Sequence, residues 1–527
     1  MFIFSILIGI YSYIIFAVGI LGLLQRNIII AITIIYLLLI LFFLRKSIRN
    51  CNLRLNLFKF LKNSTKFEFF ILAIIFVQAA INLIGALGPE LGFDVLWYHL
   101  TLPKIYLENH RIFFISGGLF YYSAMPKLIE MFYIVGNSLG GETLSKLINY
   151  SFGIFSLIAL YQFSRRYLSK TGSLLVLTLF YSNLVVGWMS ISAYVDLGRT
   201  FFELMALWGF VIWVENKKLA WFVLSAILMG FAITAKFLAI GSLLIISALI
   251  IYVYSFEKKS IGIAIKKMLE YWSFALLIVV PWLLYSLFST GNPVYPFFTN
   301  IYPIKPNFYL INPLNLSDPI SPLYLIFLPV ALILYKNIKY PLKIIALYSF
   351  IAIMIWYLTP QTGGGRFILP YLPELSIITV AVIYGFKQKI LRNIFVVLIV
   401  VMGMFSIFYR GAANFKYVPV ILGKESKSQF LSSHLNFSFG DFYDTDGYFG
   451  KHIKNSDRVL LYGFHNLYYL NFPFIDASYV KDGDTFSYIL VQGSGELPDR
   501  FKFWKQIYYN QRTNVKLYSA GGSKWVY

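Results

Sequence analysis

Among the carboxylates of this chain, Asp94 is the strongest candidate for a catalytic role. It lies in the sequence PELGFDVLWYHL (89–100), where an apolar segment long enough to cross a membrane ends and a polar, aromatic-rich segment begins. A carboxylate beside hydrocarbon costs free energy unless it is compensated, and the chain has only 23 acidic residues, so we expect Asp94 to have a function. Such a group can act as a general base. We therefore take Asp94 as the centre of a candidate active site.

Three further charged residues open a later apolar segment, in the sequence AYVDLGRTFFE (193–203). On a helix, Asp196, Arg199 and Glu203 are spaced i, i+3 and i+7 and form one stripe. Ionisable side chains in a membrane protein face the bundle interior or a wet cavity, so the stripe predicts a second part of the site, in which Glu203 supports Arg199. The alternative is a neutralised network that only packs helices.

Two cations are expected at the same membrane surface as these carboxylates. Lys236 follows GFAITA (230–235) and Arg366 follows TGGG (362–365), each at the expected end of a span. The cations can hold a phosphate while a carboxylate takes a proton, which suits a lipid-phosphate substrate. For either cation alone, the alternative is a long side chain that reaches out to the lipid headgroups.

Two residues near Asp94 have less specific signals. His99 can support Asp94, but a structural histidine at the interface is the more frequent role. Glu130 lies on an amphipathic segment and is expected to face solvent. The sequence has no zinc-ligand spacing and no glycine-rich phosphate loop, and its single cysteine excludes an intramolecular disulfide. No cofactor is therefore identified, and a divalent metal is compatible with the carboxylates but lacks a clear ligand set.

The composition is that of a polytopic membrane protein. The 527 residues are 59% hydrophobic and 13% charged, whereas soluble domains carry about a quarter charged residues. The net charge of +22 comes from short Lys and Arg clusters between apolar segments. We interpret these clusters as determinants of topology in a lipid bilayer, and we expect no nucleic acid partner.

About thirteen apolar segments are expected to cross the membrane. They lie at 2–23, 28–44, 69–88, 143–163, 172–188, 199–214, 219–235, 237–254, 270–290, 322–335, 342–358, 367–384 and 391–409. Basic clusters fall in alternate connections, at 45–66, 165–170, 217–218, 258–267, 336–343 and 387–392. The positive-inside rule then places the N-terminus in the cytoplasm, and the first external loop (89–142) and the C-terminal part outside.

The external loop contains two segments that are too polar to span the membrane. The first, 96–109, is interrupted by Pro103, and the second covers 126–139. Their aromatic residues, among them Tyr106 and Tyr133, suit a membrane surface. We therefore expect both segments to lie on the outer leaflet and to roof a cavity.

The chain divides into three expected parts. These are a transmembrane hairpin with a basic loop (1–68), a membrane domain that carries the site (69–410) and a soluble external domain (411–527). In the last part, short apolar runs predict strands, and one longer stretch predicts a helix. The strands are expected at 458–463, 487–492 and 513–518, and the helix at 497–510. We therefore expect residues 411–527 to form a small α/β domain.

The order of these motifs resembles that of the GT-C superfamily of membrane glycosyltransferases. The similarity is carried by FDVLWYHLTLPKIYL, SAMPKLIEM, AYVDLGRTFFE, GFAITAKFLAI and GGGRFILPYLPEL, and it covers about residues 69–410. The chain is most similar to the branch of protein O-mannosyltransferases and lipid A aminoarabinose transferases. It departs from the usual pattern because its acidic loop follows the third span rather than the first, so that 2–44 looks like an added hairpin. Val95 also stands where many members have a second acid, which argues against a simple metal-bridging role.

The resemblance implies a polyprenyl-phosphate sugar as donor and transfer, with inversion, to a glycan, lipid or protein acceptor on the extracytoplasmic face. It implies catalytic roles for Asp94 and Asp196, with Asp94 as general base, and binding of the donor phosphate near Lys236 or Arg366. Two other functions are compatible with the residues. One is a transporter or flippase of lipid-linked glycans, which would also need cations. The other is a non-catalytic scaffold whose aromatic-rich C-terminal domain binds glycan.

Overall fold

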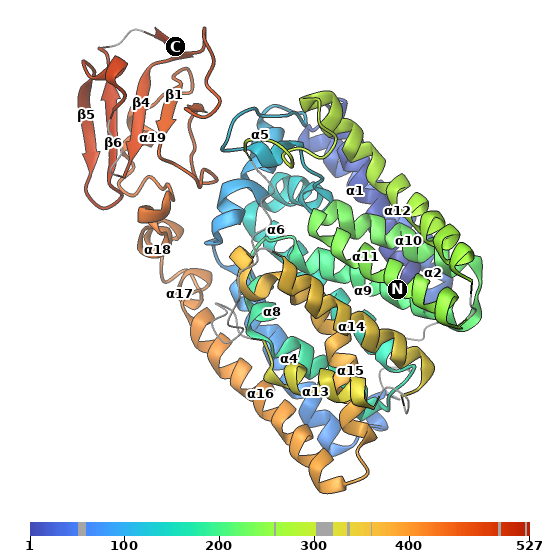
Figure 1. Ribbon diagram of the computed structural model, residues 1–527. Helices are drawn as coiled ribbons and strands as arrows, with labels where there is room; N and C mark the ends of the chain where they lie inside the picture. The colour runs from blue at the N-terminus through green and yellow to red at the C-terminus, as the bar shows by residue number, and fades with distance from the viewer. Residues whose placement is uncertain are drawn as a thin grey trace.

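The computed structural model describes the whole chain except residues 51–59, 258–259, 302–319, 335–337, 360, 494–496 and 522–523. Most of the chain forms a bundle of helices, and a small sheet domain near the C-terminus stands at one end of the bundle (Figure 1). The expected fold class, a mainly helical polytopic membrane protein with a small C-terminal domain, is confirmed. Parts of the basic loops expected at 45–66, 258–267 and 336–343 lie outside the described residues.

Nine helical segments in the described part of the chain are long and apolar enough to cross a membrane. They are α1 (Phe2–Ile20), α2 (Arg26–Asn50), α4 (Lys66–Leu87), α6 (Leu128–Ser164), α9 (Asp196–Asn216), Phe237–Ser255 with α11 (Ile240–Ile251), α12 (Ile261–Thr290), α14 (Tyr340–Leu358) and α16 (Lys389–Phe415). Four shorter apolar helices are α7 (Lys170–Tyr181), α10 (Leu219–Ala235), α13 (Pro322–Ile333) and Leu369–Gly385 with α15 (Leu372–Gly385). Each of the expected spans has a counterpart among these helices. Which end of the bundle faces the cytoplasm stays a prediction.

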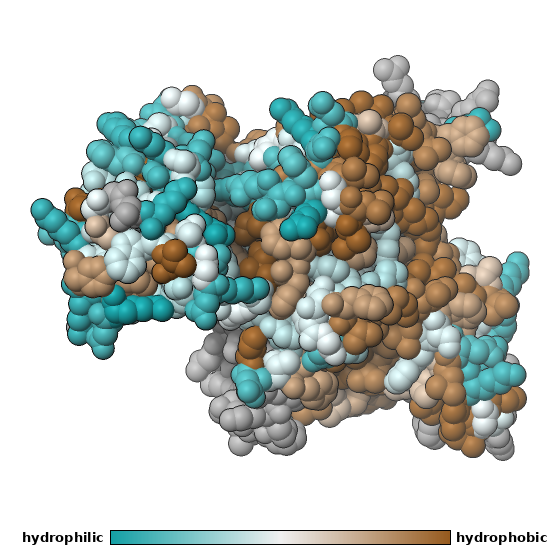
Figure 2. Space-filling model, turned by 90° about the horizontal axis from the view of Figure 1, so that it is seen from above, coloured by the Kyte–Doolittle hydropathy of each residue, from teal (hydrophilic) through white to brown (hydrophobic). Residues whose placement is uncertain are grey.

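Helix α9 lies at the centre of the bundle, and every residue of its apolar stretch is buried. The outer helices instead turn large apolar side chains outward, such as Leu38 and Phe43 on α2 and Val397 and Phe408 on α16. Burying apolar area is worth about 25 cal/mol per Å², so these faces favour lipid over water. Figure 2 shows the same contrast, with hydrophobic residues over much of the helical part and hydrophilic ones over the C-terminal domain.

The segment between α4 and α6 is folded against the bundle. It contains the short π-helix η1 (Val95–His99), α5 (Thr101–Glu108) and the 3₁₀ turn η2 (Tyr121–Ala124). Pro103 does not interrupt a helix as expected, because it lies in the first turn of α5, where its missing N–H would have no intrahelical partner.

The segments 96–109 and 126–139 were expected to lie on the membrane surface, but their tyrosines Tyr106 and Tyr133 are inside the protein. Tyr106 and Tyr133 are fully buried, because α5 and the start of α6 pack against each other and the bundle. The segment 126–139 is a separate piece as expected, because its helix, which begins at Leu128, ends at Gly140 and Gly141, whose backbone angles are not helical. Helix α6 continues beyond a kink at Gly140 and Gly141, where Gly141 adopts φ of 65°, a value that favours glycine.

The C-terminal domain contains a five-stranded sheet in the order β2-β1-β4-β6-β5. Strand β1 pairs in parallel with β2 and β4, and β6 pairs antiparallel with β4 and β5. The strands are β1 (Val459–Tyr462), β2 (Phe474–Asp476), β4 (Tyr488–Gln492), β5 (Lys505–Asn510) and β6 (Val515–Ser519), and β3 (Thr485–Phe486) pairs with β7 (Trp525–Val526). The expected strands near 458–463, 487–492 and 513–518 are present. The prediction of a helix at 497–510 is wrong, because Ile507, Tyr508 and Tyr509, which have high strand propensity, lie in β5.

The C-terminal domain rests on the segment that carries Asp94. After α16, the short helices α17 (Val418–Ile421) and α18 (Lys427–His434) lead to the domain (Figure 1). The N–H of Glu90 donates to the Tyr469 hydroxyl at 3.1 Å, and this hydroxyl donates to the Glu90 carbonyl at 2.9 Å. The ammonium of Lys104 donates to the carbonyl of Tyr468 at 2.9 Å. The boundaries at 68 and 410 stay predictions.

Candidate active site

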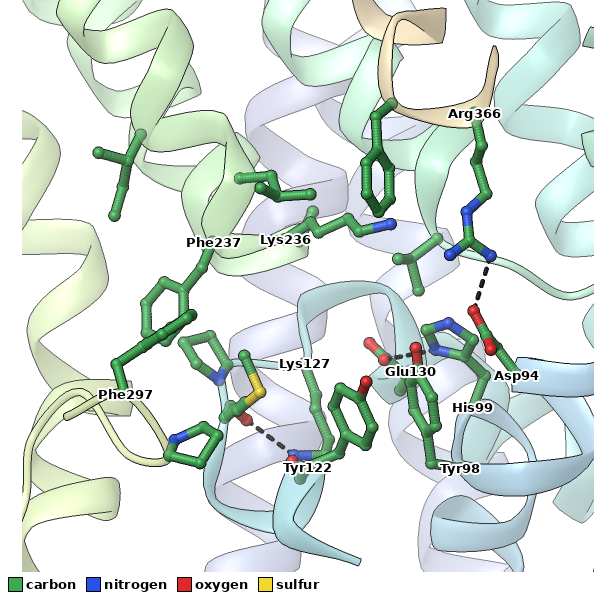
Figure 3. A pocket seen from close by; sticks show the side chains of 18 of the residues that line it. Asp94, Tyr98, His99, Tyr122, Lys127, Glu130, Lys236, Phe237, Phe297 and Arg366 are labelled. Carbon is green, nitrogen blue, oxygen red and sulfur yellow. Dashed lines mark hydrogen bonds and ion pairs between the residues drawn. The ribbon is translucent and has the colours of Figure 1, made fainter. Parts of the chain in front are cut away.

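A cavity of about 510 Å³ lies among segments that are far apart in the sequence. Its walls come from η1, the residues 121–130, the junction of α10 and α11, and the 3₁₀ segment η7 (Gln361–Phe367). Asp94 and Arg366 lie at one side of the cavity, and Phe237 and Phe297 at the other (Figure 3). The cavity therefore has a charged end and an apolar end.

Four charged side chains alternate in sign at the charged end. Arg366 Nη1 donates to Asp94 Oδ2 at 2.7 Å, and Lys236 Nζ donates to Asp196 Oδ1 at 2.8 Å. Arg366 Nε lies 3.9 Å from Asp196 Oδ2, which joins the two pairs. The side chain of Asp196 is fully buried, whereas Asp94 and Arg366 keep 19% and 13% of theirs exposed. The structure thus brings together the two carboxylates and two cations that the sequence singled out.

The guanidinium of Arg366 is held in its charged form. Burial lowers its pKa, but the carboxylates of Asp196 and Asp94 outweigh burial and raise the pKa of Arg366 above its ordinary value. The guanidinium carbon also lies 4.9 Å from the ring centroid of Tyr194. Among the described residues, Arg366 Nε has no hydrogen-bond partner, so the donors of this group are not all in use.

Asp196 is separated from the rest of the expected stripe on α9. It is the first residue of α9, where the helix dipole favours a negative charge. Arg199 Nε instead donates to Glu203 Oε1 at 2.5 Å, and Ser242 donates to the other carboxylate oxygen of Glu203. Arg199 and Glu203 are not among the described residues that line the cavity. Glu203 thus supports Arg199 as expected, whereas the alternative, a neutralised network of all three residues, does not describe Asp196, which pairs with Lys236.

His99 and Glu130 form a buried pair on the cavity wall. The His99 Nδ1 atom lies 2.8 Å from Glu130 Oε1, so the imidazole is oriented by Glu130 and not by Asp94. The expectation that Glu130 faces solvent is wrong, because η1 and α5 cover the start of α6 and leave the residue 5% exposed. The second carboxylate oxygen of Glu130 has no hydrogen-bond partner within the described structure.

Lys127 is a third cation on the cavity wall, and the sequence reasoning did not select it. It immediately precedes α6, and its ammonium donates to the carbonyls of Met125, at 2.8 Å, and Tyr122 (Figure 3). Burial lowers the pKa of Lys127 to about 7, although the nearby Glu130 acts in the opposite direction. The available signal was a lysine next to Pro126 at the start of an amphipathic segment, which also fits an ordinary surface residue.

Glu90 joins the segment of Asp94 to the segment that precedes Asp196. Its Oε1 accepts hydrogen bonds from the N–H groups of Leu91 and Gly92, at 2.9 and 2.8 Å, and from the Ser192 hydroxyl at 2.5 Å. Its Oε2 accepts from the N–H of Ala193 at 2.8 Å. The carboxylate is buried. The sequence reasoning missed this positioning role, which depends on contacts between distant segments.

Lys146 holds the other side of the same turn. Its buried ammonium donates to the carbonyls of Gly85, Gly88 and Pro89, at 3.0, 2.6 and 3.0 Å. These carbonyls lie at the end of α4, where the helix dipole favours a cation. The position of Asp94 is therefore set by two buried charges of opposite sign, Lys146 and Glu90.

Comparison with known proteins supports this picture. The family model described as dolichyl-phosphate-mannose-protein mannosyltransferase matches residues 127–285. The crystal structure of ArnT from Cupriavidus metallidurans in the apo state is similar, with a TM-score of 0.56 and 12% identity over 86% of this chain and 98% of that chain. The structure of ArnT bound to undecaprenyl phosphate gives a TM-score of 0.55 with the same identity and coverage. No curated protein matches the sequence significantly.

The fold is that of the GT-C membrane glycosyltransferases. The resemblance expected from the sequence motifs is confirmed by the family match and by the fold. The family match begins at Lys127 and includes Asp196 and Lys236, whereas Asp94 and Arg366 lie outside it. The GT-C fold therefore accounts for the placement of the segments, and the roles of individual side chains stay predictions.

The acidic residues of the site can be compared with the ligand set that a divalent metal needs. Within the part of the chain that the structure describes, no three His, Cys, Asp or Glu side chains lie close enough together to hold a metal ion. Asp94 and Asp196 are instead each paired with a cation. Both carboxylates of the described site thus have a cationic partner, and binding of a divalent metal stays a prediction.

Proposed function

We propose that this chain is a glycosyltransferase that moves a sugar from a polyprenyl-phosphate donor to an acceptor on the extracytoplasmic face. The observation that carries the proposal is the cavity, which joins Asp94, Arg366 and Lys236 at its charged end to an apolar region. This combination matches a substrate with a phosphate and a hydrocarbon chain. A polyprenyl-phosphate sugar has both, together with a reactive carbon beside the phosphate.

The cations serve the leaving phosphate in this proposal. As the bond between the anomeric carbon and the phosphate oxygen breaks, negative charge builds on the phosphate. Arg366 and Lys236 stabilise this charge from the charged end of the cavity, and Lys127 is a third cation in the cavity lining. The leaving group departs as polyprenyl phosphate, a weak base that needs charge stabilisation more than protonation.

Asp94 takes the proton of the acceptor. The acceptor oxygen or nitrogen attacks the anomeric carbon from the side opposite the phosphate, so the new bond forms with inversion. The proton of the attacking group passes to the Asp94 carboxylate, which acts as general base. In the structure Asp94 is paired with Arg366. A bound phosphate competes for this guanidinium and so releases the carboxylate for its role.

The test uses the purified protein in nanodiscs, a polyprenyl-phosphate sugar and a panel of acceptors. We expect acceptor-dependent release of polyprenyl phosphate, and we expect Asp94→Asn to reduce it on the order of 100-fold or more, because an amide cannot accept the proton. Donor binding should stay close to that of the wild type. Movement of the donor across the bilayer is measured in parallel, and movement without sugar release would assign the chain to the flippases instead.

A further inference from the structure

A second hollow lies between the C-terminal domain and the segment that carries Asp94. It holds about 220 Å³, less than the roughly 300 Å³ at which pockets for drug-sized ligands begin, so it suits a single ring or a small group. We call it the crevice. Its lining consists of Trp97, Gly118 and Leu119 from the external loop, and Leu461 to His465, Asp476 and Ala477 from the C-terminal domain.

The fold of the domain places this lining at a characteristic position. Residues 463–465 follow β1, and Asp476 and Ala477 end or follow β2, so the crevice lies at the carboxyl ends of two adjacent parallel strands. Ligands in sheets with parallel strands commonly bind at this edge. The external loop closes it from the other side, since the N–H of Leu119 donates to the Ser478 hydroxyl at 3.1 Å.

Aromatic rings connect the crevice to the active site. The ring of His465 lies 5.9 Å from that of Trp97 and 6.3 Å from that of Phe93, the neighbour of Asp94. Phe439, another residue of the C-terminal domain, lies 6.5 Å from Phe93 and is 66% exposed. A path lined by aromatic rings therefore leads from the crevice towards Asp94.

Trp97 separates the crevice from the donor cavity. Its ring lies 5.4 Å from that of Tyr122, which lines the donor cavity, and its Nε1 donates to the Leu119 carbonyl at 2.8 Å. Trp97 itself lines the crevice. The two spaces thus share one wall beside Asp94, which is the arrangement that a donor site and an acceptor site require.

The charges of the two spaces differ. Three cations line the donor cavity, whereas no Lys or Arg is among the described residues that line the crevice. Its polar side chains include the Asp476 carboxylate and the His465 imidazole. These groups can exchange hydrogen bonds with hydroxyls, and the aromatic rings offer faces for stacking. The lining therefore favours an uncharged ligand with hydroxyl groups over a second lipid phosphate.

We propose that the crevice binds the acceptor and that the acceptor is a saccharide. The proposal rests on the transferase function above, because it assigns the crevice to the second substrate of that reaction. One sugar ring occupies the crevice with its face towards the aromatic residues and its hydroxyls towards Asp476 and His465. The next sugar of the chain extends past Phe439 and Phe93 and presents its hydroxyl to Asp94. A peptide would be expected along a sheet edge instead, where its backbone can pair.

The glycines of the external loop provide a direct test. Gly118 lines the crevice, and a Cβ atom there would meet nothing within 4 Å, so we expect a large side chain at this position to occupy space in the crevice. Gly262, on α12, is equally open and serves as the matched position. Phe439 and Phe503 form a second matched pair, since both are in the C-terminal domain and are 66% and 63% exposed.

The experiment measures binding without any donor, so it does not depend on turnover. Nanodiscs with the full-length protein are applied to immobilised oligosaccharides of common hexoses and N-acetylhexosamines, and to immobilised Ser/Thr-rich peptides. We expect a subset of saccharides to be retained. Retention should fall at least tenfold in Gly118→Trp and Phe439→Ala and stay unchanged in Gly262→Trp and Phe503→Ala.

Three results would overturn the proposal. One is that no saccharide is retained above the background of empty nanodiscs, and another is that Gly118→Trp retains saccharides as well as the wild type does. The third is that peptides, rather than saccharides, are lost in Gly118→Trp, which would assign the crevice to a peptide acceptor. The proposed transferase function is judged separately, by the release of polyprenyl phosphate from the donor.

Discussion

At the scale of single residues, the alternation of charge around Arg366 decides what the site can do. Arg366 pairs with Asp94 at 2.7 Å and approaches Asp196, while Lys236 neutralises Asp196 from the other side. Two carboxylates and two cations can share a small space because each charge has a partner of opposite sign. A phosphate that enters this set adds one negative charge, and Arg366 is the residue that must redistribute its contacts.

Replacement of Arg366 should therefore affect turnover more than donor binding. Charge on the phosphate is greater in the transition state than in the bound donor, so Arg366→Met should lower turnover roughly 100-fold and weaken donor affinity less. Arg366→Lys should recover only part of the rate, because an ammonium lacks the planar guanidinium fork. Initial rates and donor titrations in nanodiscs provide both numbers. Arg111→Met, at an exposed arginine of the external loop, is the control, and equal losses in binding and turnover would contradict the assignment.

Lys127 predicts a dependence of donor affinity on pH. Its pKa is lowered to about 7, so its charge is fully present well below pH 7 and is lost as the pH rises through that value. We expect affinity for a polyprenyl phosphodiester, which does not itself titrate in this range, to fall between pH 6 and pH 9. Lys127→Arg keeps its charge and should flatten the profile. An unchanged profile in Lys127→Arg would show that the pH dependence does not come from Lys127.

The sequence predicted the charged residues of the site better than their partners. Asp94, Asp196, Lys236 and Arg366 were recognisable because charged groups at the ends of apolar segments are costly without a function. The pairing of His99 with Glu130 was not recognisable, because it depends on how η1 lies over the start of α6. Periodicity describes one helix at a time and cannot show a contact between two.

At the scale of elements, the turn after α4 is the device that holds Asp94 in place. Glu90 accepts four hydrogen bonds, two from its own turn and two from residues 192 and 193. All four partners donate to the carboxyl group, three to Oε1 and one to Oε2. The turn thus fixes the distance between the segments of Asp94 and Asp196.

Substitution of Glu90 should separate turnover from stability. In Glu90→Gln the amide nitrogen cannot accept a hydrogen bond, and an unsatisfied buried donor costs about 1–3 kcal/mol. We expect a lower melting temperature in detergent and a loss of turnover of about tenfold or more. Glu68, at the other end of α4, is also buried and accepts from the Thr65 N–H and the Thr171 hydroxyl. Glu68→Gln should lower the melting temperature but keep the turnover of the folded protein, and a similar loss of turnover in both variants would argue against a positioning role.

The elements themselves were largely predictable, and the exceptions share a physical cause. Long apolar segments can satisfy their backbone groups in a membrane only as helices, so hydropathy located the spans. Segments of mixed polarity, such as 96–109 and 126–139, were assigned to the membrane surface although the bundle buries them. In the C-terminal domain, β5 was mistaken for a helix although its residues Ile507, Tyr508 and Tyr509 favour a strand, because the helix was assigned over the whole stretch 497–510.

At the scale of the whole molecule, the basic clusters around Arg166 and Lys170 and the active site occupy opposite ends of the bundle. Arg166, after α6, pairs with Glu215 at the end of α9, and Lys170 lies 3.5 Å from Glu68 at the start of α4. Asp94 follows the other end of α4, a helix of 22 residues that is about 33 Å long. Helix direction therefore separates the described basic clusters from the cavity by about the thickness of a bilayer.

This separation predicts the orientation of the protein in the membrane. The positive-inside rule places the basic end in the cytoplasm, and the cavity with the C-terminal domain on the extracytoplasmic side. In a variant without the native cysteine, single cysteines are introduced at Lys218, after α9, and at Ser438 in the C-terminal domain, both of which are exposed. An impermeant maleimide should label Ser438→Cys in intact cells, and Lys218→Cys only after the membrane is permeabilised. The opposite pattern would place the cavity on the cytoplasmic side, and transfer would then have to occur there.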